Sequence, residues 1–355
     1  MRFTKYPAII LFLICATAFA IPLWTSCALP ARPLRAANRS DLIKRYEFSE
    51  PHMGTLFRIV IYSQDPSAAA VSARAAFQRI AELDRMLSDY RYDSELMILS
   101  RRAGSGKVVV SDDLFSVLEQ AQMWARKTNG AFDVTVGPAV RLWRRARQTG
   151  ELPAPEDLAR ARSLIGYQNI ELEHSKRMVS LLKPGMQLDL GGIAKGYAAD
   201  QALKTVKSRG HSSVLIAAGG DIAVADAPPG LKGWTVAVAA ADQPGSNPTR
   251  RILLANAAVS TSGDAEQFIE IGGERYSHIV DPHTGIGVTG QSTATVVASD
   301  ATTSDALATG LSVLGPAALP LLDSLERIAA LLVRKGDDGF QVYASSRWKE
   351  TTLSP

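Results

Sequence analysis

One short stretch of the sequence combines glycines, a lysine and an acid in a way that suits the binding of an anion. Residues 188–200 read LDLGGIAKGYAAD, so an apolar run ends in an acid, turns through two glycines and continues as a small-residue helix. Gly191 and Gly192 have no Cβ, so a ligand can approach the main chain closely, and the helix start directs amides and a positive dipole end toward it. Lys195 adds a full positive charge in the first turn. The stretch predicts a phosphate site, but an ordinary strand-turn-helix joint with a solvated lysine fits the same residues.

Two oxygen donors occur at helical spacing in a later segment, for which the pattern predicts a helix over 303–314. Asp305 and Thr309 are four residues apart, so the carboxylate and the hydroxyl lie on the same face. Together with a backbone carbonyl and waters, they suit Mg²⁺, which takes one or two carboxylates plus the phosphates of its substrate. The spacing by itself is weak evidence, because a capping or solvated pair would show it too.

An acid and a histidine near these stretches are candidates for other roles. Asp189 precedes the paired glycines, and its charge suits the hydroxyl or ring N–H donors of a ligand, or a metal, better than phosphates. His278 lies in the run SHIVDPHTG. A histidine titrates near neutral pH, so His278 is a candidate general base, although an isolated histidine is more often structural.

The elements that must position these residues alternate between helical and strand patterns. Apolar residues at helical spacing predict one helix over 71–87 and a second that begins at a Ser111 cap and ends at Asn129-Gly130. The stretch 144–157 is interpreted as a surface excursion because it contains Gly150 and two prolines. Strands are predicted at 56–62, 178–182, 187–190, 213–218, 234–240, 257–260, 276–280 and 294–298, with 178–182 and 187–190 forming a hairpin and 328–333 with 340–344 forming another. The pattern indicates an α+β fold in a single compact body.

The N-terminus has the composition of an export leader. Arg2 and Lys5 precede an apolar run over 8–23, which is followed by a polar, proline-bearing segment. The sequence AFA at 18–20 offers a cleavage site, whereas WTSC ending at Cys27 resembles a lipoprotein box, and we favour lipidation slightly over simple cleavage. We expect a leader over 1–27, a flexible tether over 28–44 and the folded domain over 45–348, on the periplasmic side of the inner membrane.

Charge and cysteine content exclude several classes of function. The first 40 residues carry five basic side chains and no acid, so subtracting five from the formal charge of +4 leaves about −1 for the body, which gives no support to nucleic-acid binding. Both cysteines lie in the leader, so the body has no disulfide. The sequence also has no Gly-x-Gly-x-x-Gly, Walker loop, His/Cys metal spacing or nucleophile-elbow serine.

Over about residues 46–345 the sequence resembles the FAD:protein FMN transferases, the ApbE-type flavin transferases. One of the matching motifs alone would be weak, but their occurrence in the family's order is specific. They are HMGT at 52–55, the run 90–96, TNGAFDV at 128–134, LDLGGIAKGY at 188–197, AGGD at 218–221, TSGD at 261–264, SHIVDPHTG at 277–285 and SDALAT at 304–309.

The resemblance implies a mixed-sheet, T-fold-like architecture and a set of ligand contacts. Mg²⁺ would be held by Gly192, through its carbonyl, with Asp305 and Thr309. Because Ala308 stands where some members have an acid, a second metal ion is in doubt. The residues that would contact FAD, which is the substrate, are Met53, Tyr90, Ala131, Phe132, Asp133, Asp189, Lys195 and Ile279. The rings of Tyr90 and Phe132 are expected to cover rings of FAD.

The reaction implied by the family is Mg²⁺-dependent transfer of FMN from FAD onto a Thr or Ser hydroxyl of an acceptor flavoprotein, with release of AMP. The acceptor would carry a motif of the type Asp-x-x-[Ser/Thr]-Gly-Ala-[Ser/Thr]. Two other functions fit the same residues. Attack by water would make the protein an FAD pyrophosphatase, and loss of the metal would leave a non-catalytic periplasmic FAD carrier.

Overall fold

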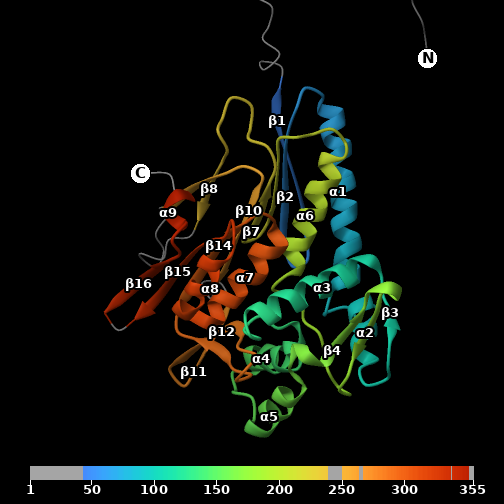
Figure 1. Cartoon of the computed structure of the whole chain (residues 1–355), viewed down its shortest axis with the longest axis vertical. Helices are drawn as coiled ribbons and strands as arrows, with labels where there is room; N and C mark the ends of the chain where they lie inside the picture. The colour runs from blue at the N-terminus through green and yellow to red at the C-terminus, as the bar shows by residue number, and fades with distance from the viewer. Residues whose placement is uncertain (1–42, 239–249, 264–266, 337, 352–355) are drawn as a thin grey trace, which may run out of the picture. The chain divides into compact units, whose positions relative to one another are not determined.

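An eight-stranded sheet forms the centre of the fold (Figure 1) in the computed structural model, which describes residues 43–238, 250–263, 267–336 and 338–351. The strand order is β1-β2-β6-β7-β10-β14-β15-β16, so β1 and β16 are the edges and the sheet does not close into a barrel. The bounds are β1 Lys44–His52, β2 Thr55–Ser63, β6 Val214–Ala218, β7 Asp221–Val224, β10 Ala257–Gly263, β14 Ser292–Ala298, β15 Ala329–Gly336 and β16 Gly339–Ala344.

The described residues all fall within one compact unit, which spans 39–355. The predicted α+β class and single body are therefore confirmed. The expected mixed sheet is not found, because every strand pair in the described residues is antiparallel. The leader over 1–27, Cys27 and most of the tether lie outside the described residues.

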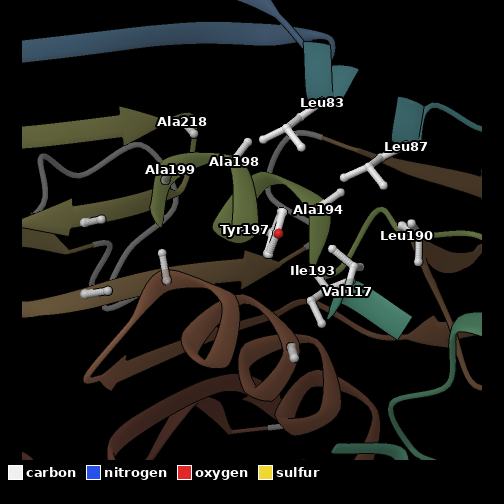
Figure 2. Close-up of a cluster of buried hydrophobic side chains, with 14 of the residues drawn as sticks. Leu83, Leu87, Val117, Leu190, Ile193, Ala194, Tyr197, Ala198, Ala199 and Ala218 are labelled. Atoms are coloured by element: carbon white, nitrogen blue, oxygen red, sulfur yellow. The ribbon is translucent and has the colours of Figure 1, made fainter. Parts of the chain in front are cut away.

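Three helices cover one face of the large sheet: α1 (Pro66–Leu87), α6 (Ala194–Lys207) and α7 (Ala301–Leu314). Figure 2 shows α6 in the middle of this layer, with Leu83 and Leu87 of α1 directed toward its alanines. Alternation along the strands decides which side chains face the helices. In β2, Ile59 and Ile61 join this core, while Val60 between them joins the core on the opposite face.

Smaller elements surround these layers. The opposite face of the sheet packs against β8 (Trp234–Val238), β9 (Arg250–Leu254) and α9 (Trp348–Thr351) through a second apolar core. The remaining strands form two small sheets, β3 (Val108–Val109) with β5 (Met178–Leu181) and β4 (Ile170–Glu173), and β11 (Phe268–Ile271) with β12 (Glu274–Val280) and β13 (Gly287–Thr289). The other α-helices are α2 (Glu95–Arg101), α3 (Asp112–Lys127), α4 (Gly137–Thr149), α5 (Pro155–Leu164) and α8 (Leu319–Ser324), and the 3₁₀ turns are η2 (Val134–Val136), η3 (Tyr167–Asn169), η4 (His174–Lys176) and η5 (Gly315–Ala318).

Most predicted elements are confirmed, including the Ser111 cap of α3, whose hydroxyl accepts a hydrogen bond from Leu114 N. Two predictions are wrong. The stretch 144–157 is not an excursion but the end of α4 and the start of α5, because its Gly150 ends one helix in a left-handed conformation and Pro155 begins the next. The segment 187–190 is not a strand either, since its amides donate elsewhere: Asp189 N to the Val134 carbonyl at 2.8 Å, for example.

Among the described residues, the helical stretch Ala301–Ser324 is long and apolar enough to cross a membrane by composition. Its place in the fold explains that composition, because α7 packs against α6, β10 and β14, and most of its residues are buried. We therefore describe it as a core helix.

Candidate functional site

A tight turn between two strands places Asp221, which was not among the predicted site residues, at one end of the large sheet. The turn between β6 and β7 is Gly219-Gly220, and a Cβ on Gly219 would lie 2.9 Å from Oγ1 of Thr55 in the neighbouring hairpin. A Cβ on Gly220 would lie 2.6 Å from the carbonyl oxygen of Thr261. Only glycine permits such close packing, which places Asp221, the first residue of β7, at the end of the sheet next to α6.

The first turn of α6 is capped by a residue from another helix. Its N-cap residue, Ile193, offers no side-chain hydrogen bond. Instead Asp305 of α7 accepts a hydrogen bond from Gly196 N at 3.1 Å. The helix start was predicted to bind a phosphate with its amides. The Gly196 amide already has a carboxylate partner, and so has Gly191 N, which donates to Asp189 Oδ1 at 2.8 Å. Lys195 and Gly192 are therefore left as the parts of this stretch that could reach an anion.

Lys195 lies between two buried carboxylates. Its Nζ is 3.0 Å from Asp221 Oδ2 and 3.4 Å from Asp305 Oδ2, and it donates a hydrogen bond to the Gly191 carbonyl at 3.2 Å. The lysine side chain is 30% exposed, whereas those of Asp221 and Asp305 are 4% and 2% exposed. Lys195 therefore links a buried acidic pair to the surface, and we call these three residues the lysine cluster.

The lysine cluster carries a net charge of −1 when all three groups are ionised. Burial acts to lower the pKa of Lys195, but Asp221 and Asp305 together raise it above its ordinary value. Burial, followed by the charge of Asp221, raises the pKa of Asp305 to about 7. The Oδ2 atom of Asp221 is buried and has no hydrogen bond of acceptable geometry, although it lies within ion-pair distance of Lys195. An acidic, incompletely satisfied cluster of this kind favours binding of a cation.

The residues predicted to hold Mg²⁺ come together where α6 and α7 cross. A Cβ on Gly196 would lie 2.1 Å from the Ala301 carbonyl oxygen, so the two helices approach as closely as glycine allows. A Cβ on Gly192 would lie 2.7 Å from Thr309 Oγ1, and Asp305 is one turn before Thr309 on α7.

These donors fit Mg²⁺ in kind, because they are a carboxylate, a hydroxyl and an adjoining backbone segment, all with oxygen atoms. In the part of the chain that the structure describes, no three His, Cys, Asp or Glu side chains gather into an all-protein metal site. A metal here would need oxygen ligands from a substrate or from water.

A second cation between two carboxylates lies at the rim of the site. Arg144 of α4 forms ion pairs with Asp89, in the loop after α1, and with Asp189, at 2.9 Å from its Oδ2. The guanidinium carbon also lies 4.2 Å from the centre of the Tyr90 ring, which is 78% exposed. We call these four residues the arginine cluster. Burial, followed by the charge of Asp189, raises the pKa of Asp89 to about 6.

The loop that carries Ala131, Phe132 and Asp133 is buried. The Phe132 side chain is 3% exposed and packs in the main core, so this geometry does not support the expectation that its ring covers a ring of FAD. Asp133 accepts hydrogen bonds from Thr135 N, from the Thr135 hydroxyl and, at 2.7 Å, from Tyr167 N. Burial raises the pKa of Asp133. Its carboxylate is therefore used to hold the loop together, and a contact of this loop with FAD through its main chain stays a prediction.

Met53 is held in an unusual backbone conformation. With Gly54 it forms the two-residue turn between β1 and β2, and both residues have positive φ, 48° for Met53 and 72° for Gly54. Its amide donates to Asp84 Oδ2 at 3.0 Å. A side chain other than Asn or Gly is disfavoured here, and such strain is common at functional sites.

His278 and Ile279 lie on β12, in the small sheet. His278 Nδ1 is 3.1 Å from the Gln267 carbonyl oxygen, which can only accept, so Nδ1 carries the proton when the ring is neutral. The Ile279 side chain is 9% exposed. The role of each in a reaction stays a prediction.

The sequence did not identify three residues that the fold brings into the site. Asp221 belongs to the AGGD motif, and its place after a buried strand and two glycines was the signal available for it. Asp89 and Arg144 had no such signal, because Arg144 lay in the stretch interpreted as an excursion.

A shallow cavity of about 680 Å³ lies elsewhere, along α6 after its first turn and at the start of α7. Its walls include Asp200, which accepts hydrogen bonds from Ala301 N at 2.9 Å and Thr302 N at 2.8 Å. None of the predicted ligand contacts lines it.

Comparison with known proteins connects this arrangement to one family. Residues 53–332 match the model of the ApbE family. The chain is 33% identical over 288 residues to the FAD:protein FMN transferase of Treponema pallidum, covering 77% of this chain and 80% of that protein. It is 31% identical over 310 residues to the FAD:protein FMN transferase of Vibrio cholerae, covering 86% and 92%.

Solved structures agree with this match. The flavin transferase ApbE from Vibrio cholerae superimposes with a TM-score of 0.79 at 29% identity, over 87% of this chain and 99% of that one. The ApbE protein from Thermotoga maritima gives a TM-score of 0.78 at 30% identity, over 88% and 100%.

Proposed function

We propose, because this chain belongs to the ApbE family, that it is an FAD:protein FMN transferase, an enzyme that takes FAD as substrate and a flavoprotein as acceptor. The finer proposal is that the acceptor group is a Thr or Ser hydroxyl and that AMP is released. The observation that supports FAD as the substrate is that Lys195, Asp305 and the Gly192–Thr309 contact meet at one crossing of α6 and α7. A cationic side chain and hard oxygen donors at one place suit a diphosphate.

The lysine cluster and the arginine cluster would bind different parts of FAD and so fix its orientation in the site. Lys195 and Gly192 would bind the diphosphate, while the exposed Tyr90 ring and Asp189 would meet a ring system at the rim. Phosphoryl transfer depends on positioning and on neutralising charge more than on covalent help from the protein. The arginine cluster would supply the positioning. The lysine cluster has a net charge of −1 by itself, so it would neutralise charge on the diphosphate only together with Mg²⁺.

In the proposed reaction, the acceptor hydroxyl oxygen bonds to the phosphorus on the FMN side, and the bond from that phosphorus to the bridging oxygen breaks. AMP leaves with the bridging oxygen, and the hydroxyl proton is taken up by a base. His278 is our candidate base, and since its Nδ1 faces the Gln267 carbonyl, Nε2 would be the atom that takes the proton. A bound Mg²⁺, held by Asp305, Thr309 and the Gly192 carbonyl, would stabilise negative charge on the diphosphate oxygens.

The decisive experiment incubates the protein with FAD, Mg²⁺ and an acceptor that carries the Asp-x-x-[Ser/Thr]-Gly-Ala-[Ser/Thr] motif. Covalent flavin fluorescence on the acceptor supports the transferase. AMP released without labelled acceptor would identify an FAD pyrophosphatase, and bound FAD left intact would identify a carrier. An acceptor whose motif Thr or Ser is replaced by Ala is the matched control and should stay unlabelled.

We also propose that the protein is exported to the periplasm and anchored through a lipid on Cys27, residues that lie outside those described by the structure. The support is the composition of the N-terminus alone. Mass spectrometry of the mature N-terminus tests the proposal: an acylated Cys27 at position one supports it, and an unmodified terminus near residue 21 would contradict lipidation.

A further inference from the structure

Arg144 makes three contacts at once, with two carboxylates and one aromatic ring. Its two terminal nitrogens pair with carboxylates from different segments, Asp89 before α2 and Asp189 before α6, and its guanidinium carbon lies over the Tyr90 ring. The Arg144 side chain is 22% exposed, and the side chains of Asp89 and Asp189 are 18% and 10% exposed. Arginine suits such a place because its flat fork can pair with two carboxylates and stack on a ring in the same geometry, which lysine cannot do.

The loop that carries Tyr90 has other contacts, but they come from α2 and from the loop itself. Arg101 of α2 donates a hydrogen bond to the Tyr92 carbonyl at 2.6 Å, and its guanidinium carbon lies 3.9 Å from the centre of the Tyr92 ring. Tyr90 N donates to Ser88 Oγ at 3.2 Å, and Ser94 Oγ donates to the Ser88 carbonyl at 2.6 Å. These bonds close the loop on itself and do not reach the neighbouring α4 or the Asp189 turn. The contacts from the loop to those segments pass through Arg144.

The position of Asp189 is fixed by the same arginine from the other side. Its Oδ1 accepts a hydrogen bond from Gly191 N at 2.8 Å, which shapes the glycine turn, and its Oδ2 accepts one from Arg144 at 2.9 Å. Arg144 thus connects the Tyr90 ring, through Asp189, to the Gly191-Gly192 turn that precedes Lys195.

We infer that Arg144 is a positioning residue, which holds the Tyr90 ring and the Asp189 carboxylate in a fixed relation so that they can receive a ring system of FAD. This inference rests on the proposed function, because it assumes that FAD is the ligand. Arg144 covers one face of the Tyr90 ring and leaves the other for a stacked ligand ring. Because these side chains are already held in place, less conformational entropy is lost when a ligand binds.

The test compares Arg144→Met and Arg144→Lys with Arg145→Met, a matched control on the same helix whose exposed guanidinium has no described ion pair. The dissociation constant for FAD is measured by fluorescence titration. We expect it to rise about 10-fold in Arg144→Met, by a smaller factor in Arg144→Lys, and by no more than about 2-fold in Arg145→Met.

Kinetics separate positioning from a general loss of structure. In Arg144→Met the KM for FAD should rise, while kcat at saturating FAD should stay within about 3-fold of the wild-type value, because Arg144 does not contact the lysine cluster. A fall in kcat with an unchanged KM would overturn the inference, and so would an unchanged dissociation constant for FAD.

Hydrogen exchange without flavin keeps the inference testable if the proposed function fails. We expect backbone amides over 88–94 to exchange about 10-fold faster in Arg144→Met than in Arg145→Met, and equal rates would overturn the inference. If wild-type protein does not bind FAD at all, the proposed function fails, while this measurement still decides whether Arg144 fixes the loop. If Arg144→Met does not fold, Asp89→Asn is used instead, because it removes one ion pair of Arg144 without changing the size of the side chain. An unchanged dissociation constant for FAD in Asp89→Asn would also overturn the inference.

Discussion

The lysine cluster and the arginine cluster have the same charge plan but differ in burial and support. In each, one cation lies between two aspartates from separate segments, which leaves a net charge of −1. Lys195 and its partners lie on helices and a strand of the core, and the two acids are almost fully buried. Arg144 instead joins a helix to two loops at the rim, next to an exposed ring.

This difference indicates a division of labour. A compact ammonium group between buried acids presents a point charge, which suits a phosphate whose oxygens have no preferred plane. A flat guanidinium stacked on a tyrosine defines a plane, which suits a ring system. The buried cluster is expected to govern the chemical step, and the rim cluster to govern the binding and orientation of FAD.

The largest effect should follow from Asp305→Asn in the lysine cluster. The change removes a charged oxygen donor for Mg²⁺ and a capping carboxylate of α6, so kcat for AMP release should fall about 100-fold or more, with a smaller change in FAD affinity. The matched control is Asp300→Asn. Asp300 is the N-cap of α7, the helix that carries Asp305, but lies outside the lysine cluster. Turnover that equals the control's would refute the metal assignment and end the comparison.

A smaller effect, confined to binding, should follow from Tyr90→Ala in the arginine cluster. Loss of the stacking ring should raise the dissociation constant for FAD about 10-fold, while kcat at saturating FAD changes little. Tyr90→Phe keeps the ring and should bind nearly as the wild type does. If Tyr90→Ala lowers kcat as much as Asp305→Asn does, the two clusters do not divide the work.

Asp221→Asn should alter the metal requirement without removing a predicted ligand. With this substitution the lysine cluster changes from a net charge of −1 to zero, so it attracts a cation less, and half-maximal activity should need several-fold more Mg²⁺. The comparison is a Mg²⁺ titration of AMP release beside Asp89→Asn, which makes the same charge change in the arginine cluster. If both variants need the same increase in Mg²⁺ for half-maximal activity, the net charge of the protein sets the metal requirement, whichever cluster carries the change.

The smallest effect is a difference in how stability depends on pH, measured by denaturant unfolding in the presence of EDTA. Folding raises the pKa of Asp89 to about 6 and that of Asp305 to about 7. The unfolded chain releases these protons near pH 4, so the native state binds more protons above that pH and loses stability as the pH rises.

Each asparagine variant should therefore lack part of this loss, by about 1–2 kcal/mol. For Asp89→Asn the difference from wild type should develop between about pH 4 and 6, and for Asp305→Asn it should extend to about pH 7. If the stability of both variants departs from that of wild type over the same pH range, the two clusters do not differ in burial as the comparison assumes.

Patterns of short range predicted much of the fold. The periodicity of α1, the Ser111 cap of α3 and the buried strand β6 before Gly219 are properties of neighbouring residues, so the sequence predicts them correctly. The error over 187–190 arose because the amides of that segment donate to distant parts of the chain, and the error over 144–157 has a local cause. Gly150 and Pro155 were interpreted as signs of irregular chain, although glycine ends helices and proline begins them as readily.

The candidate site divides in the same way. Asp305 and Thr309 are on successive turns of one helix, and the turn at Gly191-Gly192 is local too, so both were predictable. Asp221, Asp89 and Arg144 reach the site from other segments of the chain. The AGGD motif was a local signal for Asp221, but no local pattern marks Asp89 or Arg144. Phe132 was expected to face a ligand, but the loop around it folds into the core.

By itself the sequence determined the helix and strand types, the glycine turn before α6, the pair of donors on α7 and, through the order of its motifs, the resemblance to one family. Only the tertiary structure decided which acid meets which cation. Ion pairs between distant segments depend on the crossing of α6 with α7 and on the docking of α4 against the loop after α1. Such contacts are fixed by packing of the whole core, so neither spacing nor composition specifies them.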